Sequence, residues 1–262
     1  MSRVGVVVVL VKPCRLKLRA EMLMAYAMFC DGEIFGYFLF QRDREVSPTE
    51  DTIIRGVLEV FSNYYTLLDV SQRDRLTGLL NRQALEGSFD RIWNALSHPG
   101  PVNEKQGDRR SSQPTRYWLA IIDIDNFKKV NDEFGHMVGD EVLLLASRLM
   151  GLTFRATDLL YRYGGEEFVA IVSAADELIA KAIFERLRSS IEAYHFPRVE
   201  KLTVSLGYSQ IATDLLPVEV LSRADRALYQ AKEDGRNRIY NFQDLVQAGV
   251  FEETSYLEPE LF

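Results

Sequence analysis

After residue 74 the sequence alternates between segments with the apolar spacing of helices and segments with that of strands. Helical spacing is expected at 78–96, 140–152, 176–194 and 217–233. Apolar runs typical of strands lie at 117–125, 159–163, 168–172 and 202–210. Gly164-Gly165, between the second and third strands, predicts a hairpin. The order α-β-α-β-β-α-β-α is typical of an α+β domain, with a mixed sheet covered by helices.

The first 48 residues carry three shorter apolar runs, at 6–11, 22–29 and 34–40. Charges and turn residues separate these runs. We therefore predict short strands with room for one helix, a small α/β region too thin to fold as an independent domain. The run at 4–11 is eight residues long, whereas a membrane span needs about 20 apolar residues. We interpret it as a buried strand rather than a targeting segment, and we expect no membrane association.

A signalling or dimerisation helix is predicted over 49–73. Ser47, Pro48 and Glu50 have the spacing of an N-cap, a first helical position and a capping box. Apolar residues then recur in steps of three and four, at Ile54, Val57, Phe61, Tyr64 and Leu68. The spacing fits an amphipathic helix packed on its own domain and equally well a helix that pairs with a second copy.

Two segments lack any periodic pattern. The polar stretch 97–115 contains Pro and Gly, which predicts a mobile loop. The folded domain that begins at 74 is expected to end near 243, which leaves 244–262 as a C-terminal tail.

Composition excludes some classes of function. Hydrophobic residues make up 47% of the chain and charged residues 26%, so a packed core is feasible. The net charge of −7 argues against a protein that coats nucleic acid or anionic membrane, although a local group of Lys and Arg can still bind a small anion. Two cysteines, Cys14 and Cys30, make neither a disulfide framework nor a zinc cage, which indicates a reducing, cytoplasmic compartment.

Carboxylates follow two of the predicted strands. Asp123 and Asp125 end an apolar strand and share one face, while Ile124 points into the core. Glu166 and Glu167 follow the glycine pair. Turn or capping acids and exposed hairpin charges would explain each pair alone. Together they describe a phosphoryl- or nucleotidyl-transfer site, since hard oxygen ligands without His or Cys suit Mg²⁺ or Mn²⁺.

The motifs themselves resemble those of the GGDEF family of diguanylate cyclases. Arg162-Tyr163-Gly164-Gly165-Glu166-Glu167-Phe168 has the GGEEF form of the family's signature. The other matching motifs, in the family's order, are Asp74-Arg75-Leu76-Thr77-Gly78-Leu79-Leu80-Asn81-Arg82, Asp123-Ile124-Asp125-Asn126-Phe127-Lys128-Lys129-Val130-Asn131-Asp132, Phe134-Gly135-His136 with Gly139-Asp140, Val204-Ser205-Leu206-Gly207, and Ala224–Asn237. The resemblance implies a central mixed, mainly antiparallel sheet flanked by helices over 74–243.

The resemblance also implies roles for single residues. Asp123, Glu166 and the main-chain carbonyl of Ile124 match the family's metal ligands, and Glu166 or Glu167 is the candidate base. Asn131 and Asp140 match the positions that read guanine, whose edge offers one acceptor and two donors to an amide and a carboxylate. The remaining substrate-binding positions are Phe127, Lys128, Gly164, Gly165, Lys232 and Arg236.

The implied reaction joins two GTP molecules into cyclic di-GMP. The 3′-hydroxyl of one GTP attacks the α-phosphorus of the other, and pyrophosphate leaves. Each catalytic domain is expected to hold one GTP, so a homodimer is part of the mechanism. This requirement favours the pairing interpretation of the helix over 49–73.

A product-inhibition site is also implied. Arg155-Ala156-Thr157-Asp158 stands at the family's spacing from Gly164, and Arg186 is a second contact from a neighbouring domain. The guanidinium of Arg155 can bind guanine or phosphate, and Asp158 can accept from guanine N–H groups. An ordinary surface ion pair between residues i and i+3 is the alternative.

Three other functions remain open at this point: a receptor that binds cyclic di-GMP without turnover, a cyclase with relaxed base choice, and a scaffold that binds a protein partner. Intact metal and guanine positions argue against the first two. Gly32-Glu33-Ile34-Phe35-Gly36-Tyr37-Phe38-Leu39 resembles, faintly, the closing strands of a GAF sensory domain, of which about half would be missing.

Overall fold

The computed structural model describes residues 5–10, 22–30, 33–42, 45–97, 116–199 and 201–252. They form two compact units, Met1–Gln72 and Arg73–Phe262. Cys14, His98 and nearly all of the loop predicted at 97–115 lie outside the described residues. Among the residues described, no helix is both long enough and apolar enough to cross a membrane.

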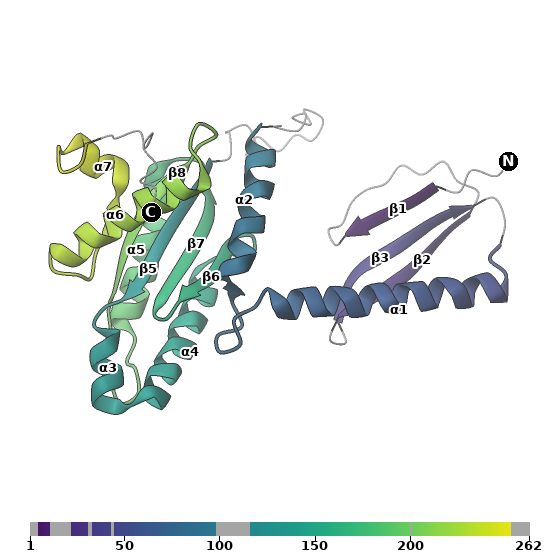
Figure 1. Cartoon of the computed structure of the whole chain (residues 1–262), viewed down its shortest axis with the longest axis horizontal. Coiled ribbons are helices and arrows are strands. Elements are labelled where there is room, and N and C mark those ends of the chain that lie inside the picture. Colours follow the sequence, from purple (N-terminus) through teal and green to yellow (C-terminus); the bar gives the residue numbers. More distant parts are fainter. Residues whose placement is uncertain are drawn as a thin grey trace, which may run out of the picture. The chain divides into compact units, whose positions relative to one another are not determined.

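The first unit consists of a small sheet and one long helix (Figure 1). Strands β1 (Gly5–Leu10), β2 (Met22–Cys30) and β3 (Glu33–Arg42) occupy the three predicted apolar runs and pair antiparallel in the order β1-β3-β2. Helix α1 (Pro48–Ser71) follows, and it packs beside β2. Its N-terminus has the predicted capping box, because Ser47 and Glu50 cap each other's main-chain N–H groups.

The second unit contains a six-stranded sheet in the order β4-β6-β7-β5-β8-β9. Its four central strands pair antiparallel, and each edge strand pairs parallel with its neighbour, which confirms the predicted mixed, mainly antiparallel sheet. The strands are β4 (Leu80–Asn81), β5 (Arg116–Ile124), β6 (Leu159–Gly164), β7 (Glu167–Ala174), β8 (Val204–Ile211) and β9 (Ile239–Asn241).

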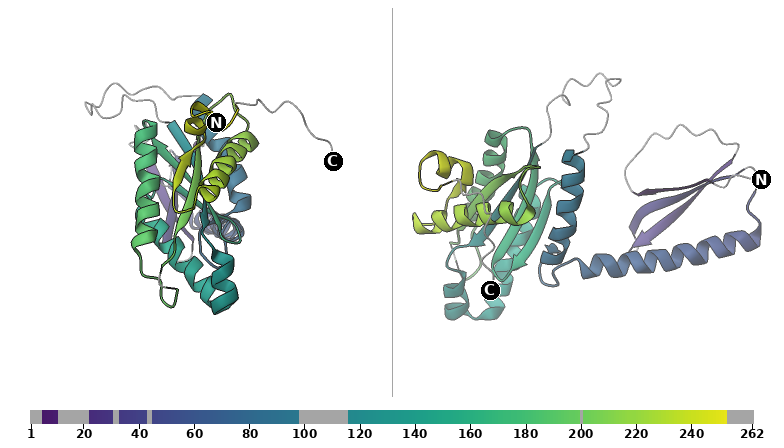
Figure 2. Two further views of the ribbon diagram at one scale, coloured as in Figure 1. Left: turned by 90° about the vertical axis from the view of Figure 1, so that its left-hand side faces the viewer. Right: turned by 45° about the horizontal axis from the view of Figure 1, so that its top comes forward.

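Helices cover both faces of this sheet (Figures 1 and 2). The first face packs on α3 (Phe127–Phe134), α4 (His136–Thr153) and α5 (Glu177–Ala193), and the second on α2 (Arg82–Ser97) and α6 (Pro217–Glu233). A short helix, α7 (Phe242–Gln247), packs against α6. Strand β5 feeds both cores, because Ala120 and Ile122 point to one face while Leu119 and Ile121 point to the other. The alternation carries Asp123 onto the α6 side.

Candidate active site

Asp123 ends the central strand in a buried position. On β5 it lies opposite Glu167 of β7 and Ser205 of β8, so neighbouring strands flank it on both sides. Its carboxylate is 2.8 Å from the Nζ atom of Lys232, at the last turn of α6. The sheet therefore presents one buried carboxylate at the edge where the β6–β7 hairpin turns.

The hairpin brings two further carboxylates to Asp123. Gly165 adopts a left-handed conformation (φ +38°) in the turn, and Glu166 and Glu167 follow it directly. The turn is tied to β5 through a main-chain hydrogen bond of 3.4 Å from Ile124 N to Glu166 O. The predicted cluster of Asp123, Glu166 and Glu167 is thus assembled by strand pairing.

Burial, and after it neighbouring acidic charges, disfavour ionisation of these three carboxylates and raise their pKa values. Burial, followed by the charge of Asp123, raises the pKa of both Glu166 and Glu167. Burial also raises the pKa of Asp123, and the opposing effect of Lys232 does not cancel it. A site with this imbalance gains from an added cation.

The donors present fit a hard divalent ion. Among the described residues, no three His, Cys, Asp or Glu side chains are already gathered as a metal site. The metal ligands expected from the sequence include only two such side chains, the carboxylates of Asp123 and Glu166, together with the main-chain carbonyl of Ile124. Oxygen donors with unneutralised negative charge are those that Mg²⁺ and Mn²⁺ prefer.

The two expected guanine-reading residues lie on adjoining helices. Asn131 is on α3 and Asp140 is on α4, and the two helices pack together. Asn131 lies directly against Gly139, where an added Cβ would be 2.0 Å from Asn131 Oδ1 and 3.2 Å from the ring of Phe127. Gly139 therefore makes room for the Asn131 side chain next to Asp140.

Replacing Gly139 by alanine should lower GTP affinity about tenfold while the fold stays intact, because the main shift falls on the movable end of Asn131 and the Phe127 ring has to give only slightly. Titration with a non-reacting GTP analogue and thermal unfolding would measure the two effects. Gly151→Ala is the control, since nothing lies within 4 Å of a Cβ built at Gly151 on the same helix. An unchanged affinity for the Gly139→Ala chain would remove Asn131 from the guanine site.

The expected phosphate-binding residues come from two directions. Lys232 lies in the last turn of α6 and Arg236 just beyond it, with Arg236 Nη1 3.5 Å from the Lys232 carbonyl, and the positive charge of Arg236 partly opposes the rise that burial causes in the pKa of Asp123. Lys128 is exposed on α3, next to buried Phe127. Lys232 and Arg236 are therefore gathered around Asp123, while Lys128 belongs to the helix that carries Asn131.

Sequence reasoning assigned no role to Arg162, which holds the hairpin turn in place. Its Nε and Nη2 atoms donate to the Gly165 carbonyl at 3.1 and 2.9 Å. Its Nη1 atom donates to both carboxylate oxygens of Asp74, at 3.1 and 3.2 Å. Asp74 in turn accepts from the N–H and hydroxyl of Thr77. Arg162 and Asp74 each belong to one of the family motifs identified in the sequence, and this membership was the only sequence signal that could have pointed to their pairing.

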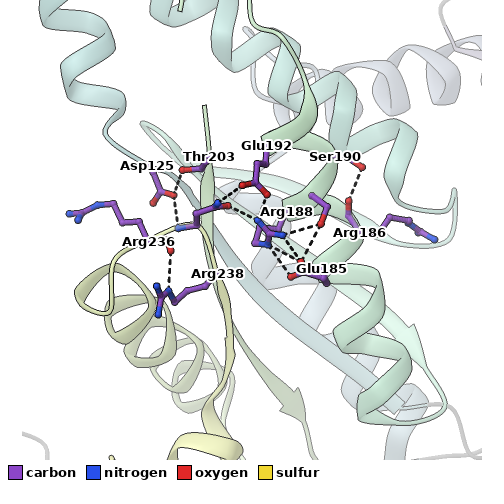
Figure 3. A network of polar contacts seen from close by, with 11 residues as sticks. Asp125, Glu185, Arg186, Arg188, Ser190, Glu192, Thr203, Arg236 and Arg238 are labelled. Atoms are coloured by element: carbon purple, nitrogen blue, oxygen red, sulfur yellow. Dashed lines mark hydrogen bonds and ion pairs between the residues drawn. The ribbon is translucent and has the colours of Figure 1, made fainter. Parts of the chain in front are cut away.

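Asp125 does not share the surroundings of Asp123, although the sequence presents the two aspartates as a pair. Its carboxylate accepts hydrogen bonds from Thr203 Oγ1, Ser205 Oγ and the main-chain N–H of Asn237, and it belongs to the polar network in Figure 3. Asp123 and Asp125 therefore have different partners, although the sequence places them on one face.

The residues of the expected inhibitory site lie near one another in the fold. Arg155 is exposed, and the Asp158 carboxylate accepts from the Arg155 main-chain N–H at 2.8 Å. Arg186, on α5, donates to the carbonyl of Thr153 at 2.6 Å. This hydrogen bond holds the Arg186 guanidinium at Thr153, which is two residues before Arg155 in the sequence.

Comparison with known proteins agrees with this geometry. The family model described as "Diguanylate cyclase, GGDEF domain" matches residues 71–238. The probable diguanylate cyclase DgcT of Escherichia coli K12 is 37% identical over 206 residues, which are 76% of this chain and 42% of DgcT. The chain thus spans less than half of that relative's length.

Solved structures of GGDEF domains also align with this chain. The GGDEF domain of DgcB from Caulobacter crescentus, in complex with c-di-GMP, aligns with a TM-score of 0.57 and 30% identity, covering 66% of this chain and 96% of that one. The coiled coil and GGDEF domain of DgcB aligns with a TM-score of 0.60 and 27% identity, covering 74% and 100%. With the family model matching well over half of the residues and the carboxylate cluster in the fold's central strands, this chain belongs to the GGDEF-domain family of diguanylate cyclases.

Proposed function

We propose that the chain condenses two molecules of GTP into cyclic di-GMP and two of pyrophosphate, in a metal-dependent reaction. The observation that carries the proposal is the group of Asp123, Glu166 and Glu167, whose pKa values are raised chiefly by burial and further by neighbouring acidic charges, beside Lys232. Such a cluster serves a reaction that brings a cation and a polyphosphate together. The names of the relatives support the same substrate and product.

The side chains divide the work between binding and proton transfer. Asn131 and Asp140 would hold the guanine edge, and Lys128, Lys232 and Arg236 the phosphates. The 3′-oxygen of one GTP forms a bond to the α-phosphorus of the other, the bond to pyrophosphate breaks, and the hydroxyl proton passes to Glu166 or Glu167. A carboxylate with a raised pKa is a better acceptor for that proton. Mg²⁺ or Mn²⁺, held by Asp123, Glu166 and the Ile124 carbonyl, would supply charge neutralisation and acidify the attacking hydroxyl.

The proposal is tested with the purified chain, GTP and Mg²⁺, followed by anion-exchange separation of the products. Cyclic di-GMP is expected, and EDTA should abolish it. To remove any bound inhibitor, the assay is repeated with the Arg155→Ala chain. If both chains lack turnover while the native chain still binds cyclic di-GMP, the cyclase assignment is wrong and the chain is a receptor.

Pairing of two copies would complete the active site, because one domain holds one GTP. Five strongly exposed apolar residues of α1 recur with the four-three spacing of a coiled-coil seam, at Ile53, Val57, Val60, Tyr64 and Leu67. Buried Leu58 lies on another side of the helix. Val57 and Tyr64 belong to the seam predicted from sequence, whereas its other members, Ile54, Phe61 and Leu68, are less exposed than Ile53, Val60 and Leu67, which take their place in the proposed stripe. We assign this stripe to a parallel dimer.

Inhibition by the product would use Arg155, Asp158 and Arg186. Exposed Arg155 supports an anion site, with Arg186 as the proposed second contact from a neighbouring domain, and the GGDEF domain of DgcB has been crystallised with c-di-GMP. Arg155→Ala should leave the initial rate unchanged and raise the product concentration that halves it at least tenfold. Progress curves with added cyclic di-GMP would measure both quantities.

The control is Arg148→Ala, which removes an exposed arginine from α4 in the same way. Inhibition that persists unchanged in the Arg155→Ala chain would show that the product binds elsewhere.

The division into 1–48, 49–73, 74–243 and 244–262 is part of the proposal. Residues 1–48 are proposed to be a GAF-like sensory region or a dimerisation element, acting on the cyclase through α1. A GTP-consuming enzyme with few cysteines would work in the cytoplasm.

A further inference from the structure

Asp125 lies one residue beyond the active-site strand, and its carboxylate is fully used by protein donors. Thr203 Oγ1 and Ser205 Oγ each donate to it at 2.7 Å, and the main-chain N–H of Asn237 donates at 3.1 Å. The residue is only 4% exposed. A buried carboxylate with three donors is satisfied within the protein, so it is a structural anchor and leaves metal binding to Asp123.

The segment that Asp125 holds has an unusual backbone. Gly235, Arg236 and Asn237 have φ angles of +109°, +62° and +49°. Positive φ is costly for residues with a side chain, and it persists only where the surroundings enforce it. Gly235 and Asn237 are residue types that tolerate this conformation, so the cost falls on Arg236, one of the expected phosphate ligands.

Helix α5 holds the same turn from the other side (Figure 3). Arg188 Nη1 donates to Asn237 Oδ1 at 2.6 Å, and Asn237 Nδ2 donates to Glu192 Oε1 at 2.8 Å. Arg188 is itself fixed by Glu185 and Glu192, both at 2.6 Å. Asn237 is thus clamped through its main chain by Asp125 and through its side chain by α5.

The two aspartates at the end of β5 therefore contact two successive segments of the chain, the last turn of α6 and the turn that follows it. Asp123 pairs with Lys232 at the end of α6, and Asp125 binds the turn that follows. We propose that Asp125 is a positioning residue, which fixes Arg236 through Asn237 so that its guanidinium meets the GTP phosphates. Arg188 and Glu192 complete the clamp. The inference rests on the proposed function of Arg236 as a phosphate ligand.

A double-mutant cycle between Asp125 and Arg236 tests the proposal. Asp125→Ala and Arg236→Ala should each weaken binding of the non-reacting analogue guanosine 5′-[α,β-methylene]triphosphate about tenfold, and the double variant should be no weaker than either. Independent, additive losses would overturn the proposal, as would native affinity in the folded Asp125→Ala chain. Asp125→Asn should lose less, because the Ser205 hydroxyl can turn and accept from the new amide.

A second variant leaves the buried Asp125 carboxylate in place and tests the contacts to α5. Asn237→Gly keeps the left-handed backbone but deletes the contacts to Arg188 and Glu192, so it should also weaken binding and add nothing to Arg236→Ala. Ser190→Ala is the control, because within the described part of the chain the Ser190 hydroxyl donates to the Arg186 carbonyl of its own helix and not to the turn. Native affinity in the Asn237→Gly chain would remove α5 from the clamp.

Calorimetry with the analogue separates this inference from the cyclase assignment. Absence of cyclic di-GMP, with the cycle still non-additive, would reject turnover and leave the positioning role. Turnover of GTP together with additive losses in the double-mutant cycle would support the cyclase assignment and reject the positioning role of Asp125. Thermal unfolding of each chain identifies any loss of affinity that comes from unfolding.

Discussion

Replacing Glu166 by glutamine is expected to lower the rate of cyclic di-GMP formation by about three orders of magnitude, within the range reported for loss of a general base. The side chain would lose both a proposed metal-ligand charge and a candidate proton acceptor, while its shape is kept. Binding of guanine should change little, since Asn131 and Asp140 lie on other elements. Single-turnover assays and titration with the non-reacting analogue would measure the two quantities.

The same variant should not melt below the native chain when no metal is present. The pKa of Glu166 is raised in the folded state, chiefly by burial and then by Asp123, so its ionised form is disfavoured there. A raised acid pKa stabilises the fold below the unfolded pKa, and that contribution is lost as pH rises through the folded value. A neutral glutamine does not ionise, so at pH 7 the variant does not lose the stability that the native chain loses when Glu166 ionises.

Added Mg²⁺ gives a further readout. It should raise the melting temperature of the native chain more than that of the Glu166→Gln chain, because a ligand that binds the folded state stabilises it. Glu133→Gln, which neutralises an exposed carboxylate on α3, is the matched control for rate and stability. Cyclisation at the native rate by the Glu166→Gln chain would exclude Glu166 from the metal site.

Local patterns explain why much of the fold and the carboxylate cluster could be predicted. The hairpin was recognisable from Gly164-Gly165 between two apolar runs, and α6 from its apolar spacing and initial proline, so both were found with correct or nearly correct bounds. The edge strands β4 and β9 escaped because two and three residues are too short for a period. The helix predicted from 78 begins at Arg82, after β4.

The supporting polar contacts of the site could not be predicted, because they join residues far apart in the chain. Asp125 reaches Thr203, Ser205 and Asn237 across 78, 80 and 112 positions, and Arg162 reaches Asp74 across 88. No periodicity or propensity encodes such a pair; only the sheet order brings its members together. The residues proposed to bind or react were visible in motifs, whereas those that hold them in place required the tertiary structure.

The pairing stripe on α1 leads to the second large effect. Val60→Glu together with Leu67→Glu would place charge at two positions that are each 70% exposed in the single chain and would be buried in a parallel dimer. We expect a monomer by sedimentation and a rate of cyclic di-GMP formation at least about a hundredfold lower at low enzyme concentration, since two bound GTP molecules must meet. Analogue binding per chain should be unchanged. Asn63→Glu, an exposed charge outside the stripe, is the control. Monomers that still cyclise at the native rate would place the pairing surface in the catalytic domain, and α1 would then be a helix that only packs on its own sheet.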